Sequence, residues 1–289
     1  MREISEKAYA KLNISLDVMD GRDDGYHDMM MVMQTVSLWD DVRLTLNSEG
    51  KMSASSNLRF IPGDERNLAV KAAVRFFREL GDEQSGVHVD MQKRIPVGAG
   101  MAGGSADAAA VLRGLNKLFD RPFSLEKLME LGADVGSDVP FCVMGGTALA
   151  EGRGEILSPL PPMPRCSFLI CKPEFSISTP ELFRKLDASP MRRHPDTQGI
   201  IQALEKGELI QICRRMYNVF EDVDDRRMRS VAEIKGALLD NGALSAMMTG
   251  TGSAVFGVFD DDSAAQKGLE AMKSYCPFSC LAEPVSIEN

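Results

Sequence analysis

The sequence predicts an α+β protein in which helices cover one face of a mixed sheet. Residues 8–18 alternate apolar and polar side chains with the period of two that is typical of a strand. Strand-like and helix-like segments then alternate along the chain without the regular repeat of a parallel barrel. Prolines at 159, 161, 162 and 164 favour extended chain. We expect the boundary between two domains, residues 1–158 and 159–289, at these prolines.

The N-terminal part is expected to begin with strands and to continue with three helices. The strand at 8–18 places Tyr9, Lys11 and Asn13 on one polar face. A helix at 67–80 can end at Gly81, because glycine readily adopts the left-handed conformation of a helix C-terminus. The remaining expected segments are a loop at 20–25, extended chain at 32–38 and 42–46, a strand around 87–91, helices at 105–119 and 124–131, and a strand at 146–150.

The C-terminal part alternates between the two kinds of segment. Short apolar runs rich in β-branched and aromatic residues predict strands, and longer runs with helical spacing predict helices. The expected strands are 168–171, 246–249, 255–259 and 279–284, and the expected helices are 180–186, 199–217, 226–239 and 264–272.

Composition excludes several classes of protein. The net charge of −9 argues against a general nucleic-acid binder, which needs a basic face. There is no run of 18 apolar residues, and the charged start of the chain lacks an apolar signal region, so we expect a cytoplasmic protein without a membrane span. The six cysteines form no C-x-x-C pair and only three histidines are present, which predicts free thiols and no zinc site.

A glycine-rich segment carries the strongest functional signal. Four glycines fall within residues 98–104, between a predicted strand and a predicted helix. Glycines let a backbone approach a ligand closely, and a helix N-terminus offers free N–H groups and a positive dipole end. Such a site suits a triphosphate. Ser105 can offer its hydroxyl to phosphate or Mg²⁺, or it can simply cap the helix. The expected ATP-binding residues are Pro96, Val97, Gly98, Ala99, Gly100, Met101, Ala102, Gly103, Gly104, Ser105 and Ala106.

The segment differs from two common nucleotide motifs. No Gly-Lys-Ser/Thr follows the glycines, so it is not a Walker A loop. Gly98, Gly100 and Gly103 have dinucleotide spacing, but a Rossmann unit needs an acidic residue at the end of the next strand. Residues 121–126 begin a helix there instead, which disfavours a nicotinamide oxidoreductase.

The segment resembles the ATP loop of the GHMP kinase superfamily, and other segments resemble that superfamily in the same order along the chain. These are residues 10–16, 136–141 and 249–256, with a weaker match at 218–221. Asp24-Gly25-Tyr26-His27 and Asp138-Val139-Pro140-Phe141 resemble one branch, the diphosphocytidyl-methylerythritol kinases. The chain departs from the usual loop at Met101, Ala102 and Ala106, and from the weaker motif at Val219-Phe220.

The resemblance implies a fold and a reaction. The N-terminal, ATP-binding domain would resemble ribosomal protein S5 domain 2, and the C-terminal domain would be ferredoxin-like. The enzyme would use ATP and Mg²⁺ to phosphorylate the 2-hydroxyl of a cytidine diphosphate-linked methylerythritol, on the non-mevalonate route to isoprenoids. We expect this small-molecule substrate, no nucleic-acid or membrane partner, and a monomer or homodimer.

The resemblance also implies roles for residues. Asp138 matches the catalytic aspartate, although it could equally cap a short helix. Lys11 matches the catalytic lysine; a lone strand lysine is otherwise usually solvated. Tyr26 and His27 match the cytidine-recognition pair, and Phe183 is either a second stacking aromatic or a core residue. The other expected substrate-binding residues are Asn13, Lys93, Thr179, Gly250, Thr251 and Gly252, of which Lys93 could also lie on the surface.

Three alternatives remain open from the sequence. Another GHMP kinase, acting on homoserine, mevalonate or a sugar, would share the loop, and only the Tyr26-His27 pair and the context of Asp138 separate it from the diphosphocytidyl-methylerythritol kinases. A catalytically silent nucleotide-binding protein would be indicated by loss of Lys11 or Asp138, and both are present. The third alternative is a nicotinamide oxidoreductase.

Overall fold

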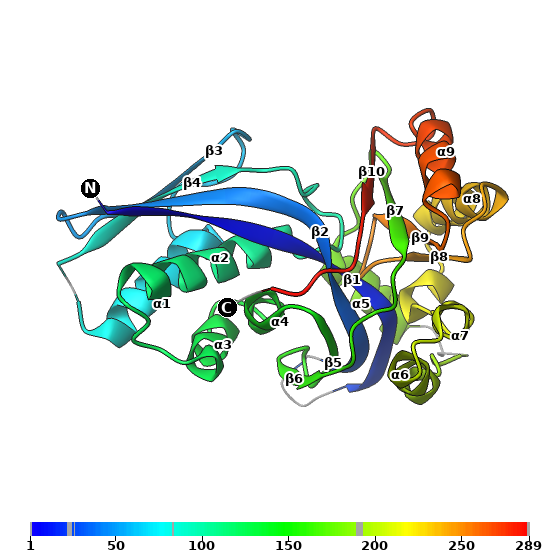
Figure 1. Cartoon of the computed structure of the whole chain (residues 1–289), viewed down its shortest axis with the longest axis horizontal. Helices are drawn as coiled ribbons and strands as arrows, with labels where there is room; N and C mark the ends of the chain where they lie inside the picture. Colours follow the sequence, from blue (N-terminus) through cyan, green and yellow to red (C-terminus); the bar gives the residue numbers. More distant parts are fainter. Residues whose placement is uncertain (1, 22–24, 26, 83, 189–192, 288–289) are drawn as a thin grey trace.

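The computed structural model describes residues 2–21, 25, 27–82, 84–188 and 193–287. These residues form two sheets, which lie on opposite sides of the molecule in Figure 1. In the larger sheet the strand order is β3-β4-β2-β5-β6, with β1 paired to β2; in the smaller it is β10-β7-β9-β8. The strands are β1 (Glu3–Gly21), β2 (His27–Asn47), β3 (Met52–Ser56), β4 (Gly86–Gln92), β5 (Thr147–Glu151), β6 (Ile156–Pro159), β7 (Ser167–Lys172), β8 (Ser245–Met248), β9 (Val255–Phe259) and β10 (Phe278–Ala282).

The larger sheet is mixed, because β3 and β4 are parallel while its other pairs are antiparallel. Its helices gather on one face (Figure 1). Alanines fill much of the buried face of α2, which lets the helix approach β1 and β2 closely. A Cβ atom at Gly114 would lie only 2.6 Å from Leu44 Cδ1. The four helices are α1 (Leu68–Leu80), α2 (Gly103–Leu118), α3 (Leu125–Ala133) and α4 (Val139–Met144).

The smaller sheet is antiparallel throughout. Two helices, α8 and α9, pack against its strands, while α6 and η1 reach back to β2 and β1 of the larger sheet. The C-terminal segment also joins the sheets, since Val285 N donates to Thr35 O at 3.0 Å. The helices of this part are α5 (Thr179–Asp187), α6 (Thr197–Glu205), α7 (Leu209–Cys213), the 3₁₀ helix η1 (Val219–Asp222), α8 (Arg227–Asp240) and α9 (Asp262–Met272).

Several predicted elements need correction. The single helix expected at 199–217 is wrong, because Gly207 has a φ of 67° and the chain turns there between α6 and α7. The two extended stretches expected at 32–38 and 42–46 are one continuous strand, β2. Strands β3 and β6 are short edge strands that the sequence pattern did not reveal.

Candidate active site

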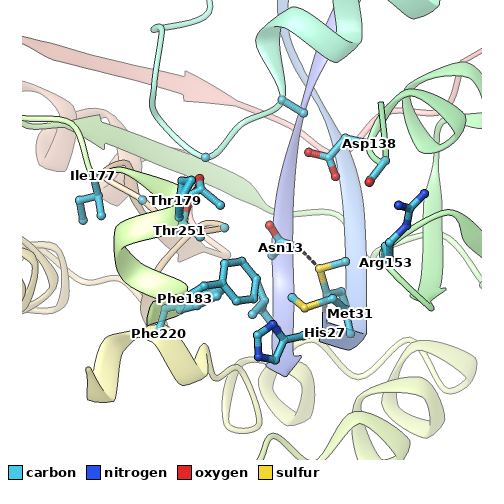
Figure 2. Close-up of a pocket in the computed structure, with 18 of the residues that line it drawn as sticks. Asn13, His27, Met31, Asp138, Arg153, Ile177, Thr179, Phe183, Phe220 and Thr251 are labelled. Carbon is cyan, nitrogen blue, oxygen red and sulfur yellow. Dashed lines mark hydrogen bonds between the residues drawn. The ribbon is translucent and has the colours of Figure 1, made fainter. Parts of the chain in front are cut away.

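A pocket of about 680 Å³ lies between the two sheets, within the usual size range of small-ligand sites. It brings together β1, β2, the glycine-rich loop (residues 96–104), the start of α4, helix α5 and the turn after β8 (Figure 2). The lining residues that matter below are Lys11, Asn13, His27, Met31, Gly98, Gly100, Ala102, Ser105, Ser137, Asp138, Arg153, Ile177, Thr179, Phe183, Asp187, Phe220, Gly250, Thr251 and Gly252.

The glycine-rich loop alternates between the pocket and the core. Gly98, Gly100 and Ala102 line the pocket with φ values of 64°, 76° and 57°. Between them, the Ala99 and Met101 side chains are buried. Met101, a departure from the usual loop, therefore fills core volume and leaves the ligand side to backbone. Ala102 adopts a left-handed conformation although it is not glycine, so the replacement does not prevent the turn.

The middle of the loop is fixed by backbone contacts from both sheets. Lys11 N donates to Met101 O at 3.2 Å, and Ala254 N donates to Ala99 O at 3.2 Å. The Thr249 hydroxyl donates to Gly100 O at 3.3 Å, and a Cβ atom at Gly100 would collide with Thr249 O. Glycine is required here by close approach as well as by positive φ.

Helix α2 begins at Gly103, two residues before the predicted start, and Ala102 occupies the N-cap position without a side-chain bond. The alternative that Ser105 caps the helix is therefore wrong. Ser105 lies in the first turn and lines the pocket. The first-turn N–H groups and the positive end of the helix dipole are thus available beside the pocket, as an anion site requires.

Lys11 and Asp138 line the same pocket from different elements. The Lys11 side chain is buried in β1, and its Nζ donates to Asn13 Oδ1 at 2.7 Å. Asp138 directly precedes α4 but makes no capping hydrogen bond within the described chain, so its carboxylate is not used as a helix cap. Figure 2 shows this carboxylate pointing into the pocket. Lys11 is not the solvated strand lysine that was its alternative.

A buried thiol, that of Cys142 in α4, lies behind the pocket wall. Burial, chiefly, and the Asp138 carboxylate raise the pKa of Cys142 to about 12, while the Lys11 ammonium acts to lower it. Both charged groups therefore act on the same point behind the pocket wall.

Asn13 organises the floor of the pocket. Its Oδ1 accepts from Lys11 Nζ, and its Nδ2 donates to Met31 Sδ at 3.3 Å, the dashed line in Figure 2. Its backbone N donates to Thr249 Oγ1 at 3.1 Å. Tyr9, expected on the same face, instead packs edge-on against Trp39, because the pairing of β1 with β2 shifts register between Tyr9 and Lys11.

The opposite end of the pocket is built from rings. His27 and Phe183 stack with centroids 5.0 Å apart and an interplanar angle of 26°. Phe183 also packs edge-on against Phe220, so it is both a pocket residue and part of the hydrophobic packing. His27 Nε2 lies 2.7 Å from Asp187 Oδ1. Tyr26, the predicted partner of His27, lies outside the described residues.

Four further predicted substrate-binding residues lie where α5 meets the turn after β8. The hydroxyls of Thr179 and Thr251 are 2.8 Å apart, which links the start of α5 to residues 250–252. All four predicted residues in this region, Thr179, Gly250, Thr251 and Gly252, line the pocket.

Lys93 does not belong to the pocket wall in the described structure. Its side chain is 2% exposed, and its Nζ lies beneath the loop between the carboxylates of Asp40 and Asp107. The expectation that Lys93 meets phosphate or ribose finds no support in this geometry, and neither does its surface alternative. An ammonium already held by two buried carboxylates has no free face for a ligand.

The structure adds pocket residues that the sequence did not assign. Arg153 lies on the same wall as Asp138 (Figure 2). Ser137 directly precedes Asp138 and lines the pocket with it. Asp187 had no sequence signal, since it approaches His27 across 160 residues. Met31 and Ile177 supply apolar lining.

The described residues contain no cluster of three or more His, Cys, Asp or Glu side chains that could hold a metal ion. A dedicated all-protein metal cage is therefore not present in that part of the chain. None of the helices described there is both long enough and apolar enough to cross a bilayer.

Comparison with known proteins identifies the class. The model of the GHMP kinases N terminal domain matches residues 67–146, and the model of the GHMP kinases C terminal domain matches residues 200–277. The chain belongs to the GHMP kinase family and has its two-domain fold, and it is an ATP-dependent kinase. These matches confirm the family and fold class expected from the motifs.

More specific relatives share most of the chain. The 4-diphosphocytidyl-2-C-methyl-D-erythritol kinase of Clostridium perfringens is 45% identical over 273 residues, 94% of each chain. That of Geobacillus kaustophilus is 44% identical over 274 residues, again 94% of each. A solved 4-(cytidine 5'-diphospho)-2C-methyl-D-erythritol kinase matches with a TM-score of 0.80 and 30% identity, over 97% of this chain and 98% of that chain. The homoserine kinase of Cytophaga hutchinsonii also reaches 0.80, at 21% identity over 99% and 95% of the chains, which shows a shared fold alone.

Proposed function

We propose that this kinase transfers the γ-phosphoryl group of ATP to the 2-hydroxyl of 4-diphosphocytidyl-2-C-methyl-D-erythritol. One observation carries the proposal: a single pocket joins the glycine-rich loop, the Lys11 and Asp138 pair, and the stacked rings of His27 and Phe183. The named relatives at about 45% identity support this substrate. The pathway would be the non-mevalonate route to isoprenoid precursors.

The catalytic step assigns one role to each charged group. Asp138 accepts the proton of the substrate hydroxyl while the hydroxyl oxygen attacks the γ-phosphorus of ATP. The bond from that phosphorus to the bridging oxygen then breaks and ADP is released. Lys11 offsets the negative charge that develops on the transferred group. Asn13 holds the Lys11 ammonium in place through the 2.7 Å hydrogen bond. Positioning supplies much of the remaining rate enhancement.

ATP would be held by the loop residues 96–106, chiefly through backbone N–H groups and the first turn of α2. Mg²⁺ fits this donor set, because it binds proteins through few ligands and keeps water and phosphate oxygens as the others. The Ser105 hydroxyl is an oxygen donor of the pocket that would help to hold it, together with water and phosphate oxygens. When bound, the ion would neutralise phosphate charge.

The cytidine half of the substrate would lie at the ring-lined end. An aromatic ring can stack on a base, and imidazole can hydrogen-bond the edge of a base. His27 and Phe183 supply these groups, and we place Tyr26 with them as a prediction. Thr179, Gly250, Thr251 and Gly252 would bring backbone and hydroxyl groups to the middle of the substrate.

Residues 1–158 and 159–289 remain our proposed domain limits. The cytoplasm is the compartment that we propose.

A coupled assay of ADP release tests the substrate. The purified protein should use the cytidyl diphosphate substrate and should show little turnover with mevalonate, homoserine or galactose. Mevalonate, homoserine and galactose serve as the controls, because they are the substrates of other kinases with this kind of loop. Turnover of mevalonate without turnover of the cytidyl compound would reverse the substrate assignment and leave the family intact.

A further inference from the structure

A buried cluster of charges beneath the glycine-rich loop has no part in the proposed mechanism. Lys93 follows β4, Asp40 lies in β2 and Asp107 lies in α2; their side chains are 2%, 0% and 5% exposed. Lys93 Nζ is 2.5 Å from Asp40 Oδ2 and also donates to Asp107 Oδ2. None of the three is among the described residues that line the pocket.

Lys93 connects the two ends of the loop. Its backbone lies where the chain enters the loop, and its Nζ also donates to Gly103 O at 3.3 Å, where the chain leaves it. The backbone of Lys93 is itself fixed by Asn57, whose Oδ1 accepts from Lys93 N at 2.8 Å and whose Nδ2 donates to Lys93 O at 3.2 Å. The lysine is thus a short tie between two fixed points ten residues apart.

Asp40 fixes Lys93 and the start of the glycine-rich loop. Its Oδ1 accepts from the backbone N of Arg94 and, at 2.8 Å, from that of Ile95, while its Oδ2 accepts from Lys93. The exit side packs tightly on Ile95, because a Cβ atom at Gly103 would lie 3.1 Å from Ile95 Cγ2. Through Gly103 O and Asp107 Oδ2, Lys93 therefore contacts α2 at two points of its first turns.

Stability alone does not account for this cluster. One ammonium serves two carboxylates in a buried site, and Asp107 Oδ1 has no partner among the described residues. Buried ions are costly to desolvate, and well-packed apolar residues often replace them without loss of stability. A short ionic tie does offer fixed geometry, which an anion site made of backbone N–H groups needs.

We propose that Lys93 is a positioning residue for nucleotide binding. It holds the entry of the glycine-rich loop and the first turn of α2 at the spacing at which both face the ATP phosphates. The inference rests on the proposed ATP site, and it replaces the direct ligand contact expected for Lys93 from the sequence.

The test compares three variants in equilibrium binding of ATP and of CDP by titration calorimetry. Lys93→Met removes the tie. Lys93→Met with Asp107→Asn removes the tie and the surplus carboxylate together, so that Asp40 keeps its backbone bonds and the fold survives. Arg94→Met is the matched control, because the neighbouring Arg94 makes its 2.6 Å ion pair with Asp41 on the surface, with 52% of its side chain exposed.

Both Lys93 variants should bind ATP at least about tenfold more weakly, because a binding site that is no longer preorganised loses affinity. CDP affinity should stay unchanged in the double variant, and Arg94→Met should match the wild type with both ligands. Thermal melting of each variant reports folding separately.

Wild-type affinity for ATP in the folded double variant would overturn the inference. Equal losses of ATP and CDP affinity would also overturn it, because a purely structural role damages both halves of the pocket. If the wild type itself bound no ATP, the proposed ATP site would fall as well, so the two failures are distinguishable.

Discussion

The two ends of the pocket are built in different ways. At the phosphate end, the loop is fixed by backbone hydrogen bonds from Lys11 and Ala254 and, beneath it, by buried ions. At the base end, the determinants are side chains: stacked rings and the Asp187 carboxylate, whose side chain is 52% exposed. The first end is set by where the main chain runs, and the second by which side chains are present.

This difference matches the chemistry of the two ligands. A triphosphate is recognised through N–H groups and a helix dipole, so the loop tolerates unusual side chains at Met101 and Ala106 provided that its path is kept. A base is recognised through its face and its edge, so the identity of the rings sets the choice of substrate. Substitutions should therefore affect the loop through backbone geometry and the base end through side-chain loss.

The largest effect is expected at Asp138, where the two ends meet. Asp138→Asn should lower kcat by about 10²- to 10⁴-fold, since the amide cannot accept the hydroxyl proton. ATP and CDP affinities should change little, because the replacement has nearly the same size. Steady-state kinetics with parallel binding measurements check this. Equal loss of turnover and of both affinities would point to misfolding or to a wrong assignment.

Gly100→Ala should weaken ATP binding at the phosphate end of the pocket without replacing any side chain that contacts a ligand. The new methyl group would collide with Thr249 O, and the φ of 76° is strained for alanine. Displacement of the loop should weaken ATP binding about 10- to 100-fold, from a strain of about 1–3 kcal/mol. Gly207→Ala is the matched control, because Gly207 also has positive φ but lies between α6 and α7 with open space around its Cβ position. ATP titration of both variants should show loss in the first alone.

Phe183→Leu should weaken only the base end. Leucine keeps apolar contact with Phe220 but cannot stack on a base or on His27. Base stacking is worth about 1–3 kcal/mol, so KM for the cytidyl substrate should rise roughly 10-fold or more while KM for ATP stays constant. Phe183→Tyr keeps the ring and should retain most of the affinity. A rise in KM for ATP would show that the two ends are not independent.

The same difference decides how far the sequence could predict the site. The glycine pattern specified the loop and its ligand class because the motif is local, and Lys11, Asn13 and Asp138 were assigned to the pocket by their own motifs. Lys93 was misplaced because nearness to the loop in sequence does not say whether a side chain points above it or beneath it.

Long-range features were not accessible to such local patterns. Asp187 is brought to His27 by the fold of the whole chain, and strand β3 shows its role only once it pairs with β4. The helix expected at 199–217 failed for a local reason, since one glycine at 207 was enough to turn the chain between two apolar helical segments.

The smallest effect concerns the buried charges themselves. Burial, opposed by Lys93 and reinforced by the neighbouring Asp40 carboxylate, raises the pKa of Asp107 to about 7. A carboxyl group with a raised pKa binds more protons in the folded than in the unfolded chain between pH 4 and 7. The stability it contributes is therefore complete below the unfolded pKa and is lost as pH rises through about 7.

Asp107→Asn isolates this contribution, because asparagine stays neutral at every pH. Between pH 5 and pH 8 the melting temperature of the variant should rise relative to that of the wild type, by about 2–4 °C for each kcal/mol of ionisation cost. Asp41→Asn is the matched control, because Asp41 is next in sequence to Asp40 but its side chain is 45% exposed, so the same chemical change is made outside the buried cluster. Melting curves at four pH values suffice. If the difference in melting temperature between Asp107→Asn and the wild type also stayed constant, the Asp107 carboxylate would remain ionised beneath the loop over this range. Lys93 would then compensate its charge fully, and the buried charge would carry no stability cost that depends on pH.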